Sequence, residues 1–396
     1  MSKTLTEIAQ QLSAPRTVRN KKTSEVEVVI QVPKVQLIYA FNGTGKTRLS
    51  REFKQLISPK ASGAEGDAQV DTPELSRNKM LYYNAFTEDL FYWDNDLTGD
   101  AVYRLKIQPN SYTDWLLTLL KDLGQDGNIV NYFQRYANDK LTPHFSTDFS
   151  EVTFSLERGN EEHSPYIKLS KGEESNFIWS VFYTLLDQAV TIRNVVEPSE
   201  RETSAFDQLE YVFIDDPVSS LDENHLIELA VNLASLLKSS QSDLKFIVST
   251  HSPLFYNVLF NELNGKTCYM LERFEDGSFA LNEKHGDSNK SFSHHLHLKQ
   301  AIEKAIADNK VERFHFTLLR NLYEKTASFL GHPKWSELLP DDKQLYLSRV
   351  LNFTSHSTLS NEGVADPTPA EKAMVKLLLD HLKSSHRFWQ QEGQNG

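Results

Sequence analysis

Few features of this sequence suggest a secreted, membrane-spanning or unfolded protein. Its 396 residues include one cysteine, Cys268, so no disulfide can form within the chain, which fits a reducing cytoplasm. The 16 Gly and 14 Pro are too few for a low-complexity chain, and the 23 Phe and 15 Tyr argue against disorder. No run approaches the ~18 apolar residues that span a bilayer, and the N-terminal MSKTLTEIAQQLS has no apolar signal core. We therefore expect a folded, cytoplasmic protein with no membrane partner.

The net charge of -12 is concentrated in the first part of the chain. Residues 285–396 carry 14 Lys and Arg against 13 Asp and Glu, whereas residues 1–284 carry 28 against 41. The last 112 residues also hold 9 of the 13 histidines. Because charge and titratable chemistry change at the same point, we predict one domain over residues 1–284 and another over residues 285–396. The overall acidity argues against a basic protein that coats nucleic acid.

A glycine-rich turn joins a short apolar run, residues 35–39 (VQLIY), to a helical pattern that begins RLSREF. The turn contains Asn42, Gly43, Thr44, Gly45, Lys46 and Thr47. A strand, a glycine turn and a helix form the context of a phosphate-binding loop, in which backbone N–H groups contact phosphate oxygens. Lys46 would then contact the β and γ phosphates, and the Thr47 hydroxyl would bind Mg²⁺. Ala40 occupies the position of the first motif glycine, so the match depends on residues 42–47.

Two further predicted strands end in polar side chains. Residues 211–215 (YVFID) lead to Asp215 and Asp216, and an acid beside a phosphate loop can orient Mg²⁺ and its water. The second acid can polarise the attacking water, although two acids that merely cap a turn are the alternative. Residues 245–250 (KFIVST) precede His251, which we place on a neighbouring parallel strand at the same sheet edge, where ligands bind. His251 can then contact a γ-phosphate, and a purely structural histidine is the alternative.

A fourth motif, LSKGEE, starts a long predicted helix with the sequence SNFIWSVFYTLLDQAV. Ser170 and Glu173 have the spacing of a capping box, which satisfies the first N–H groups of a helix. The motif, which includes Gly172, also offers a second helix N-terminus whose N–H groups can bind a phosphate. A well-capped helix without a ligand is the alternative.

These four motifs, in this order, resemble those of the ABC-type ATPases, especially the soluble chromosome-structural and DNA-repair members. The resemblance implies an α/β P-loop NTPase domain that binds ATP or GTP with Mg²⁺. LSKGEE replaces the signature LSGGQ, and residues 219–222 (SSLD) match the D-loop. Asn84 lies about where a further Mg²⁺ or water ligand occurs, and residues 85–168 leave room for a helical insert. Asp216 stands where most members carry Glu, which favours slow hydrolysis.

The same resemblance implies an oligomer. In that family the signature motif of one protomer completes the nucleotide site of another. We therefore expect Ser170 and Gly172 to act across a homodimer interface, with a dimer of dimers as the larger alternative.

From about residue 285 the sequence pattern is helical, with apolar residues at i, i+3 and i+4 spacing. Arg320 and Glu324 are four residues apart, so they share a helix face at the border of an apolar stripe. Together with His356 they can cleave RNA without a metal ion. Either the carboxylate or the imidazole removes the 2′-hydroxyl proton, the other protonates the leaving 5′-oxygen, and the guanidinium stabilises the phosphorane. Viewed alone, an Arg–Glu pair is more often a surface salt bridge. Arg349 and His356 also match the Arg-x4–6-His spacing of HEPN-type ribonucleases. This alternative keeps His356 and assigns the arginine role to Arg349 in place of Arg320.

The whole chain closely resembles the PrrC-type anticodon nucleases of bacteria. The likeness extends from KTLTEIAQQLS and VPKVQLIYAFNGTGKTRLS, through KLSKGEESNFIWSVFYTLLDQ, to FHFTLLRNLYEKTASFLG and the final QNG. It implies a toxin in which an ABC-type NTPase controls a C-terminal ribonuclease with Arg320, Glu324 and His356 as catalytic residues. The implied substrate is tRNA-Lys, cut 5′ to the wobble base of the anticodon loop to leave 2′,3′-cyclic phosphate and 5′-OH ends.

The resemblance also implies how the nuclease is controlled. A type I DNA restriction–modification complex holds it latent until phage infection, GTP hydrolysis drives activation, and dTTP stabilises the active form. Asp287 matches an acid that reads the modified wobble base, which an aspartate can do by accepting hydrogen bonds. An ordinary turn residue is the alternative.

Two other functions are compatible with the sequence. One is an ABC-type NTPase of a DNA-repair or defence complex whose C-terminal helices bind partners without cleaving RNA. The other is a regulatory NTPase of an antiphage complex whose killing chemistry lies in another chain. Within the nuclease hypothesis, Glu324 and His356 can take the acid and base roles in either order.

Overall fold

The computed structural model describes residues 2–19, 28–59, 79–84, 87, 89–94, 102–137, 139–158, 162–164, 166–217, 223–263, 266–274, 276–284, 294–344, 346–347 and 367–385. The chain divides into two compact units, Met1–Gly286 and Asp287–Gly396, called here the first and the second unit. In the described part of the chain, no helix combines the length and the apolar character that crossing a bilayer requires.

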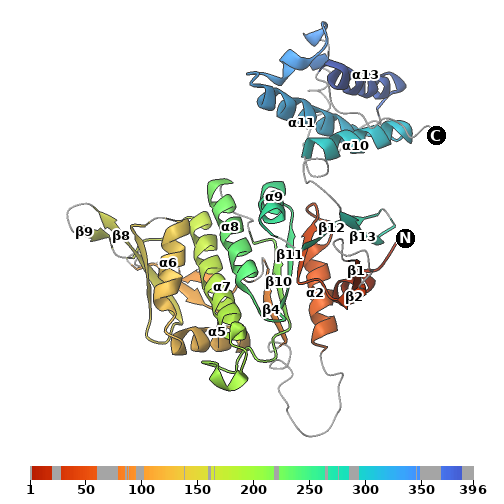
Figure 1. Ribbon diagram of the computed structural model, residues 1–396. Helices are drawn as coiled ribbons and strands as arrows, with labels where there is room; N and C mark the ends of the chain where they lie inside the picture. The colour runs from red at the N-terminus through yellow and green to blue at the C-terminus, as the bar shows by residue number, and fades with distance from the viewer. Residues whose placement is uncertain are drawn as a thin grey trace, which may run out of the picture. The chain divides into compact units, whose positions relative to one another are not determined.

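A six-stranded sheet forms the centre of the first unit (Figure 1). Its strands, in spatial order, are β13 (Phe279–Lys284), β12 (Lys266–Arg273), β3 (Val35–Tyr39), β11 (Lys245–Thr250), β10 (Tyr211–Asp215) and β4 (Met80–Tyr83). All are parallel except β13, which pairs antiparallel with β12 at the edge. The strands predicted over residues 35–39, 211–215 and 245–250 are confirmed and are neighbours. β3 and β10 are buried throughout, because apolar runs fill a parallel sheet that is covered on both faces.

Helices cover the two faces of this sheet. α1 (Leu5–Ser13) and α2 (Lys46–Ile57) pack on one face, where Phe53 and Ile38 belong to one buried cluster. Successive side chains of a strand point to opposite faces, so Tyr39 points the other way and meets Tyr256 of α9 (Pro253–Glu262), with ring centroids 5.9 Å apart. α8 (Glu223–Ser239) packs against α9, and α7 (Lys171–Asn194) packs against α8 (Figure 1).

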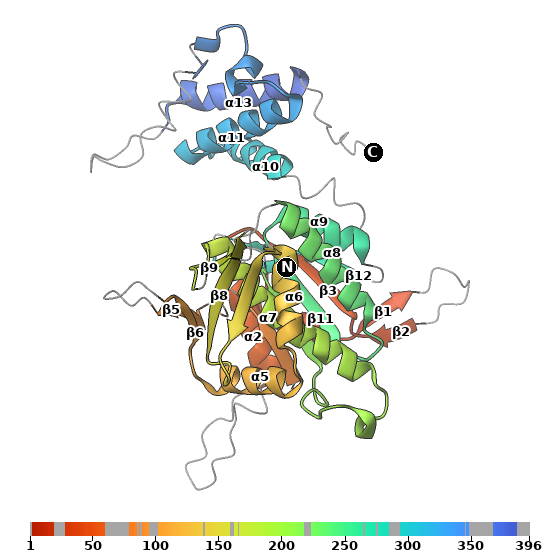
Figure 2. The ribbon, with the colours of Figure 1, turned by 90° about the vertical axis from the view of Figure 1, so that its left-hand side faces the viewer.

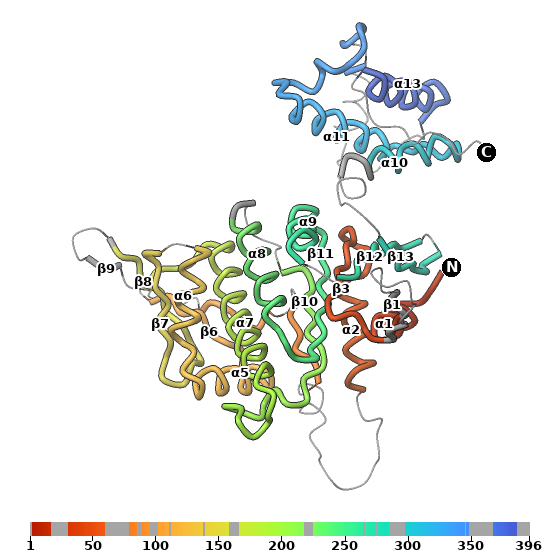
Figure 3. Tube along the Cα trace, viewed as in Figure 1, coloured from red at the N-terminus to blue at the C-terminus, as the bar shows by residue number. Residues whose placement is uncertain are grey.

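Three smaller features complete the first unit. β1 (Arg16–Arg19) and β2 (Val28–Gln31) form an antiparallel pair, and η1 (Pro198–Glu200) follows α7 in the chain. Lys3 forms an isolated antiparallel bridge with Phe279, so the N-terminal segment runs beside β13 (Figure 3).

Residues 85–168 do not form the helical insert that we predicted. They contain α5 (Ser111–Asp122) and α6 (Asp126–Tyr136), but also a five-stranded antiparallel sheet (Figure 2). Its strands are β5 (Phe91–Asp94), β6 (Arg104–Ile107), β7 (Leu141–Phe145), β8 (Glu151–Arg158) and β9 (Glu162–Ser164). In β8, Val152 and Phe154 are fully buried and alternate with more exposed residues. The prediction was wrong because this period-two pattern indicates a half-buried strand and not a helix.

Every regular element described in the second unit is helical. These elements are α10 (His294–Ala307), α11 (Arg313–Leu330), η3 (Trp335–Leu338) and α13 (Pro369–Ser385). They enclose a core of their own, to which Ile302 of α10, Leu319 of α11 and Leu378 of α13 contribute. This core is what positions α11, the helix that carries Arg320 and Glu324.

Candidate functional site

The phosphate loop follows β3 and ends at the first residue of α2. Gly43 and Gly45 have φ of 79° and 107°, in the left-handed region that glycine adopts readily. A Cβ at Gly45 would also lie 3.3 Å from Cε1 of Phe279, so a side chain there would be both strained and crowded. Gly45 precedes α2 without a side-chain cap, which leaves the first N–H groups of that helix directed at the loop. This backbone suits an anion.

The last two side chains of the loop, Lys46 and Thr47, meet the acids at the end of β10. Thr47 Oγ1 donates a hydrogen bond to Asp215 Oδ2 at 2.7 Å, and Ser249 Oγ donates to Asp215 Oδ1 at 2.5 Å. Lys46 Nζ lies 3.6 Å from Asp216 Oδ2. The parallel order of β3, β11 and β10 therefore brings the loop and both acids to one sheet edge. Ser249 of β11 was not foreseen, although it directly precedes the last residue of a predicted strand.

The two adjacent acids have different electrostatic environments. Burial raises the pKa of Asp215, which is 1% exposed, above its ordinary value. Burial would also raise the pKa of Asp216, but the hydrogen bond and charge of His251 and the charge of Lys46 hold it below the ordinary value. His251 Nδ1 lies 2.5 Å from Asp216 Oδ2, across the pairing of β10 with β11. The placement of His251 beside the acids is thus confirmed.

The backbone conformation of Asp216 orients its carboxylate toward His251. Asp216 has φ of 55°, in the left-handed region that an aspartate adopts less readily than glycine does. Its Oδ1 also accepts a hydrogen bond from the backbone N–H of His251 at 3.3 Å. An acid held by an imidazole in this way can orient or polarise a water molecule.

The donor set at this edge suits Mg²⁺ with a nucleotide. Mg²⁺ usually keeps several waters and takes one or two protein oxygens together with phosphate oxygens, and Thr47 and Asp215 supply such oxygens. Among the described residues, no group of three or more His, Cys, Asp or Glu side chains is arranged to hold a metal ion by itself.

Asn84 directly follows β4, the strand that pairs with β10. It is 5% exposed, and its Nδ2 donates a hydrogen bond to the Tyr82 hydroxyl at 2.6 Å. The Tyr82 hydroxyl in turn lies 2.6 Å from Ser50 Oγ of α2, and burial raises the pKa of Tyr82. Asn84 is therefore linked to the helix that follows the phosphate loop, through a tyrosine that no sequence motif singled out. Its role as a ligand of Mg²⁺ or water stays a prediction.

The predicted cap of α7 is confirmed. Ser170 Oγ accepts a hydrogen bond from the backbone N–H of Glu173, and the backbone N–H of Ser170 donates to Glu173 Oε2 at 2.8 Å. One turn on, the buried Glu174 accepts hydrogen bonds from Lys171 Nζ at 2.8 Å and from Trp93 Nε1 of β5 at 3.0 Å. The antiparallel sheet thus contacts the helix start that carries the signature-like motif. The action of Ser170 and Gly172 across a dimer interface stays a prediction.

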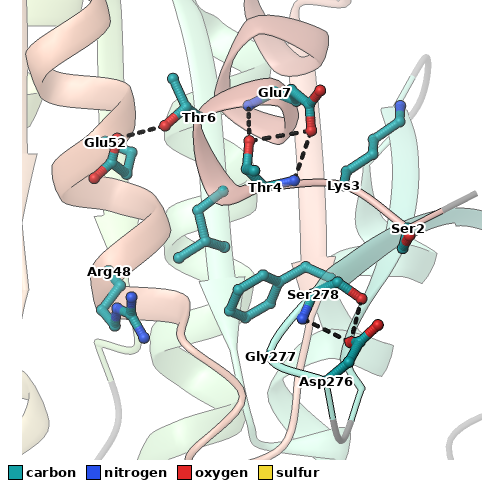
Figure 4. A pocket seen from close by; sticks show the side chains of 12 residues that line it. Ser2, Lys3, Thr4, Thr6, Glu7, Arg48, Glu52, Asp276, Gly277 and Ser278 are labelled. Atoms are coloured by element: carbon teal, nitrogen blue, oxygen red, sulfur yellow. Dashed lines mark hydrogen bonds between the residues drawn. The ribbon is translucent and has the colours of Figure 1, made fainter.

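A cavity of about 530 Å³ lies beside the phosphate loop (Figure 4). Its walls are the N-terminal segment, α2 and the turn between β12 and β13. Arg48, which directly follows Thr47, lines one side, and Phe279, which touches the Gly45 position, lines another. The sequence did not indicate this cavity, because its three walls come from distant parts of the chain.

In the second unit, Arg320 Nε donates a hydrogen bond to Glu324 Oε1 at 2.7 Å. The two side chains are 33% and 38% exposed, and their neighbours Leu319 and Tyr323 on α11 are buried. The pair therefore lies at the border of the apolar stripe, as predicted from the spacing. His356, Arg349 and Asp287, as well as the D-loop residues 219–222, lie outside the described residues, so their predicted roles are not addressed by the structure.

The chain is similar along its whole length to a curated anticodon nuclease of Escherichia coli. The two are 78% identical over 396 residues, which is 100% of this chain and 100% of that protein. No protein-family model matches the chain.

Similarity to solved structures is much weaker. The SMC head bound to the C-winged helix domain of ScpA is 11% identical and covers 67% of this chain and 95% of that chain, with a TM-score of 0.34. The cbiO1 part of the ABC transporter complex cbiONQ from Clostridium perfringens is 12% identical and covers 74% and 94%, with a TM-score of 0.33. TM-scores of this size do not define a common fold.

Proposed function

The chain belongs to the PrrC-type family of anticodon nucleases, and from that premise we propose that it is an endoribonuclease that cuts a tRNA within its anticodon loop. The substrate is tRNA-Lys, and the cut falls 5′ to the wobble base. Arg320, Glu324 and His356 of the second unit perform the cleavage. A nucleotide bound by the first unit, an ABC-type P-loop NTPase, controls it.

The arrangement of Arg320 and Glu324 is the observation that carries this proposal. Their side chains lie one helical turn apart and are joined at 2.7 Å on a face of α11 that solvent reaches. A guanidinium and a carboxylate held together at an accessible surface can meet the same phosphodiester from one side. Single-stranded loops with unpaired bases are the form of RNA that proteins read by sequence, and an anticodon loop is such a form.

The chemistry is an attack by the 2′-oxygen on phosphorus as the bond to the 5′-oxygen breaks. One of Glu324 and His356 takes the proton of the 2′-hydroxyl, and the other gives a proton to the leaving 5′-oxygen. Arg320 stabilises the negative charge on the phosphorane. The products are a 2′,3′-cyclic phosphate and a 5′-hydroxyl, and no metal ion takes part. A HEPN-like arrangement, in which Arg349 replaces Arg320, is the competing assignment.

The first unit binds ATP or GTP with Mg²⁺ in this proposal. Three features support it: the left-handed glycines of the loop, the Thr47–Asp215 hydrogen bond and the Asp216–His251 pair. Mg²⁺ would supply charge neutralisation at the phosphates, while Lys46 binds them. dTTP acts as a further ligand that stabilises the active form. Two protomers complete each other's sites through Ser170 and Gly172, as a homodimer or as a dimer of dimers.

The proposal includes a biological setting, which the resemblance to the family implies. The enzyme is a cytoplasmic antiphage toxin of the abortive-infection type, held latent by a type I restriction–modification complex. Asp287 contacts the modified wobble base of the tRNA.

Purified full-length protein, incubated with nucleotide and end-labelled bulk tRNA, tests this function. EDTA added after activation separates the metal-dependent nucleotide step from cleavage. We expect one cut in one tRNA species, with a cyclic phosphate end, and we expect Arg320→Ala and His356→Ala to abolish it. Lys325→Ala, which removes an exposed cation next to Glu324 in the sequence, is the control and should cut normally.

Two results would contradict the proposal. Intact tRNA together with DNA-stimulated nucleotide hydrolysis would indicate an ATPase of a DNA complex. Cleavage that needs a companion protein, and that survives in Arg320→Ala, would place the nuclease in another chain.

A further inference from the structure

A second cavity adjoins the proposed nuclease residues. It has a volume of about 470 Å³ and lies between the end of α11 and η3. Glu324, the partner of Arg320, is one of its lining residues, and Ser328 lies four residues further along the same face of α11. His332, which lies beyond the end of the helix, also lines the cavity. Lys334 and Trp335 line it from the segment that follows α11. A molecule in this cavity would therefore touch the side chain of Glu324.

The turn after α11 builds the far wall of this cavity. Gly331 ends the helix with φ of 78°, and the backbone N–H of His332 donates a hydrogen bond to the Ala327 carbonyl at 2.9 Å. This hydrogen-bonded glycine cap reverses the chain and leads it through Pro333 into η3. The reversal is local, so it brings the residues that follow α11 back beside the last turns of that helix.

The aromatic side chain of the cavity, Trp335, packs on a buried residue of the core. Trp335 is partly buried and packs against the edge of Tyr323, with ring centroids 6.1 Å apart and planes at 67°. Tyr323 is 1% exposed, and its hydroxyl donates a hydrogen bond to the Leu378 carbonyl of α13 at 2.9 Å. The indole is thus supported by the core of the second unit while it also lines the cavity.

The polar side of the cavity carries groups that suit a nucleotide. Lys334 is exposed and supplies a cation, and His332 Nδ1 lies 3.1 Å from Glu337 Oε2. Because Glu337 engages Nδ1, the ring nitrogen that can meet a ligand is Nε2. Ser328 adds a hydroxyl that can both donate and accept. An aromatic wall, a cation and several hydrogen-bonding groups are what an unpaired base and its phosphate require.

We propose that this cavity is a subsite for one unpaired base of the RNA substrate, adjacent to the scissile phosphate. Trp335 stacks on the base, Lys334 contacts its phosphate, and His332 and Ser328 contact the base edge. The cavity volume lies within the range of about 300–1,000 Å³ that is usual for small-ligand pockets. The inference rests on the proposed function, because it assigns part of the same RNA-cleaving site.

The test combines protein variants with altered RNA. Full-length protein is assayed with an anticodon stem-loop RNA and with versions that carry an abasic nucleotide at each loop position in turn. Trp335→Leu should lower kcat/KM by about 5- to 150-fold, the range for one stacked base. Trp335→Phe should restore most of the loss, because a phenyl ring keeps the stack. One abasic position should lower cleavage by wild type but cause no further loss in Trp335→Leu.

One control and one further subsite variant separate a subsite from a loss of folding. Phe329→Ala removes an aromatic side chain of α11 that is 88% exposed and does not line the cavity, and it should cut at the wild-type rate. Lys334→Ala changes an exposed side chain, so it should not disturb folding. Because it removes a cation that contacts phosphate, it should raise KM and flatten the salt dependence of RNA binding.

The outcomes distinguish the inference from the function on which it rests. If wild type cuts the stem-loop but Trp335→Leu and Lys334→Ala match it, the subsite is refuted and the proposed function stands. If the losses from the abasic nucleotide and from Trp335→Leu add fully at every position, the base does not stack on Trp335. If wild type does not cut RNA at all, both proposals fail together.

Discussion

Substitution of Arg320 by alanine separates a catalytic role from a structural one. The Arg320–Glu324 pair is an i,i+4 ion pair whose side chains are each about a third exposed, the kind most often found as a surface salt bridge. If the pair serves to stabilise α11, loss of the Arg320 side chain would lower the stability of the protein and affect the cleavage rate only indirectly. If Arg320 contacts the phosphorane, loss of its side chain would lower the cleavage rate and leave the stability almost unchanged.

The two costs differ enough to be told apart. Exposed pairs of this kind contribute about 0.2–1 kcal/mol to stability. Loss of one group that stabilises developing negative charge lowers the rate about 10²- to 10³-fold, which corresponds to about 2.7–4 kcal/mol in activation free energy. Arg320 is a third exposed and its buried neighbours stay in place, so no cavity opens in the core. We therefore expect a loss of at most about 1 kcal/mol in stability beside a 10²- to 10³-fold loss in cleavage.

The assay measures both quantities on the same preparations. Denaturant midpoints followed by circular dichroism report stability, and single-turnover cleavage of labelled tRNA reports chemistry. Glu324→Gln keeps the size and one hydrogen bond but removes the charge, so it should fold normally and cleave slowly. Lys325→Ala is the control for loss of a cation and should match wild type in both measurements.

One pattern would refute this reasoning. If Arg320→Ala lost more than about 2 kcal/mol of stability, and if its cleavage recovered when the protein was stabilised by nucleotide, the pair would be structural.

Three further predictions concern nucleotide binding and stability. Lys46→Ala should weaken nucleotide binding about 10- to 150-fold, measured with a fluorescent nucleotide, because it removes a charged hydrogen-bond donor; unchanged affinity would contradict the assignment of the loop. His315 is buried, and burial lowers its pKa below the ordinary 6.5, while its Nδ1 accepts a hydrogen bond from the Glu312 backbone N–H at 2.9 Å. The unfolded chain therefore binds a proton first, so stability should be complete above about pH 6.5 and fall as the pH drops from there toward the lowered pKa. His315→Gln keeps an acceptor without titrating and should remove this dependence in denaturant titrations; an unaltered pH profile would speak against it. Ser170→Ala should cost about 1 kcal/mol by loss of the cap with Glu173, and Ser170→Asp should restore it; equal denaturation midpoints for all three proteins would argue that the cap contributes nothing.

Features that depend on neighbours in the chain could be predicted from the sequence. The strands over residues 35–39, 211–215 and 245–250 are short apolar runs of the kind that fill a parallel sheet, and all three are present. The capping box of Ser170 is a local pattern, since its hydrogen bonds join residues three apart. The meeting of His251 with Asp216 was also predicted, because parallel strands bring their carboxyl ends to one edge, although the pairing of β10 with β11 is itself a tertiary contact.

Features that depend on residues far apart in the chain needed the tertiary structure. Within residues 85–168, the period-two pattern of β8 indicates a strand, but which strands pair with it in the antiparallel sheet depends on residues far apart in the chain. The contact of Phe279 with the Gly45 position joins residues more than two hundred positions apart, and no pattern within either segment indicates it.

The nuclease site shows the same division. Helical spacing placed Arg320 and Glu324 on one face, because 3.6 residues per turn dictate it. That Glu324 also borders a cavity backed by Trp335 depended on a chain reversal at Gly331 and on packing against Tyr323. Sequence alone thus determined which residues share an element, since short-range geometry is the same in every protein. The tertiary structure decided which elements meet, because that choice is made by the packing of the whole core.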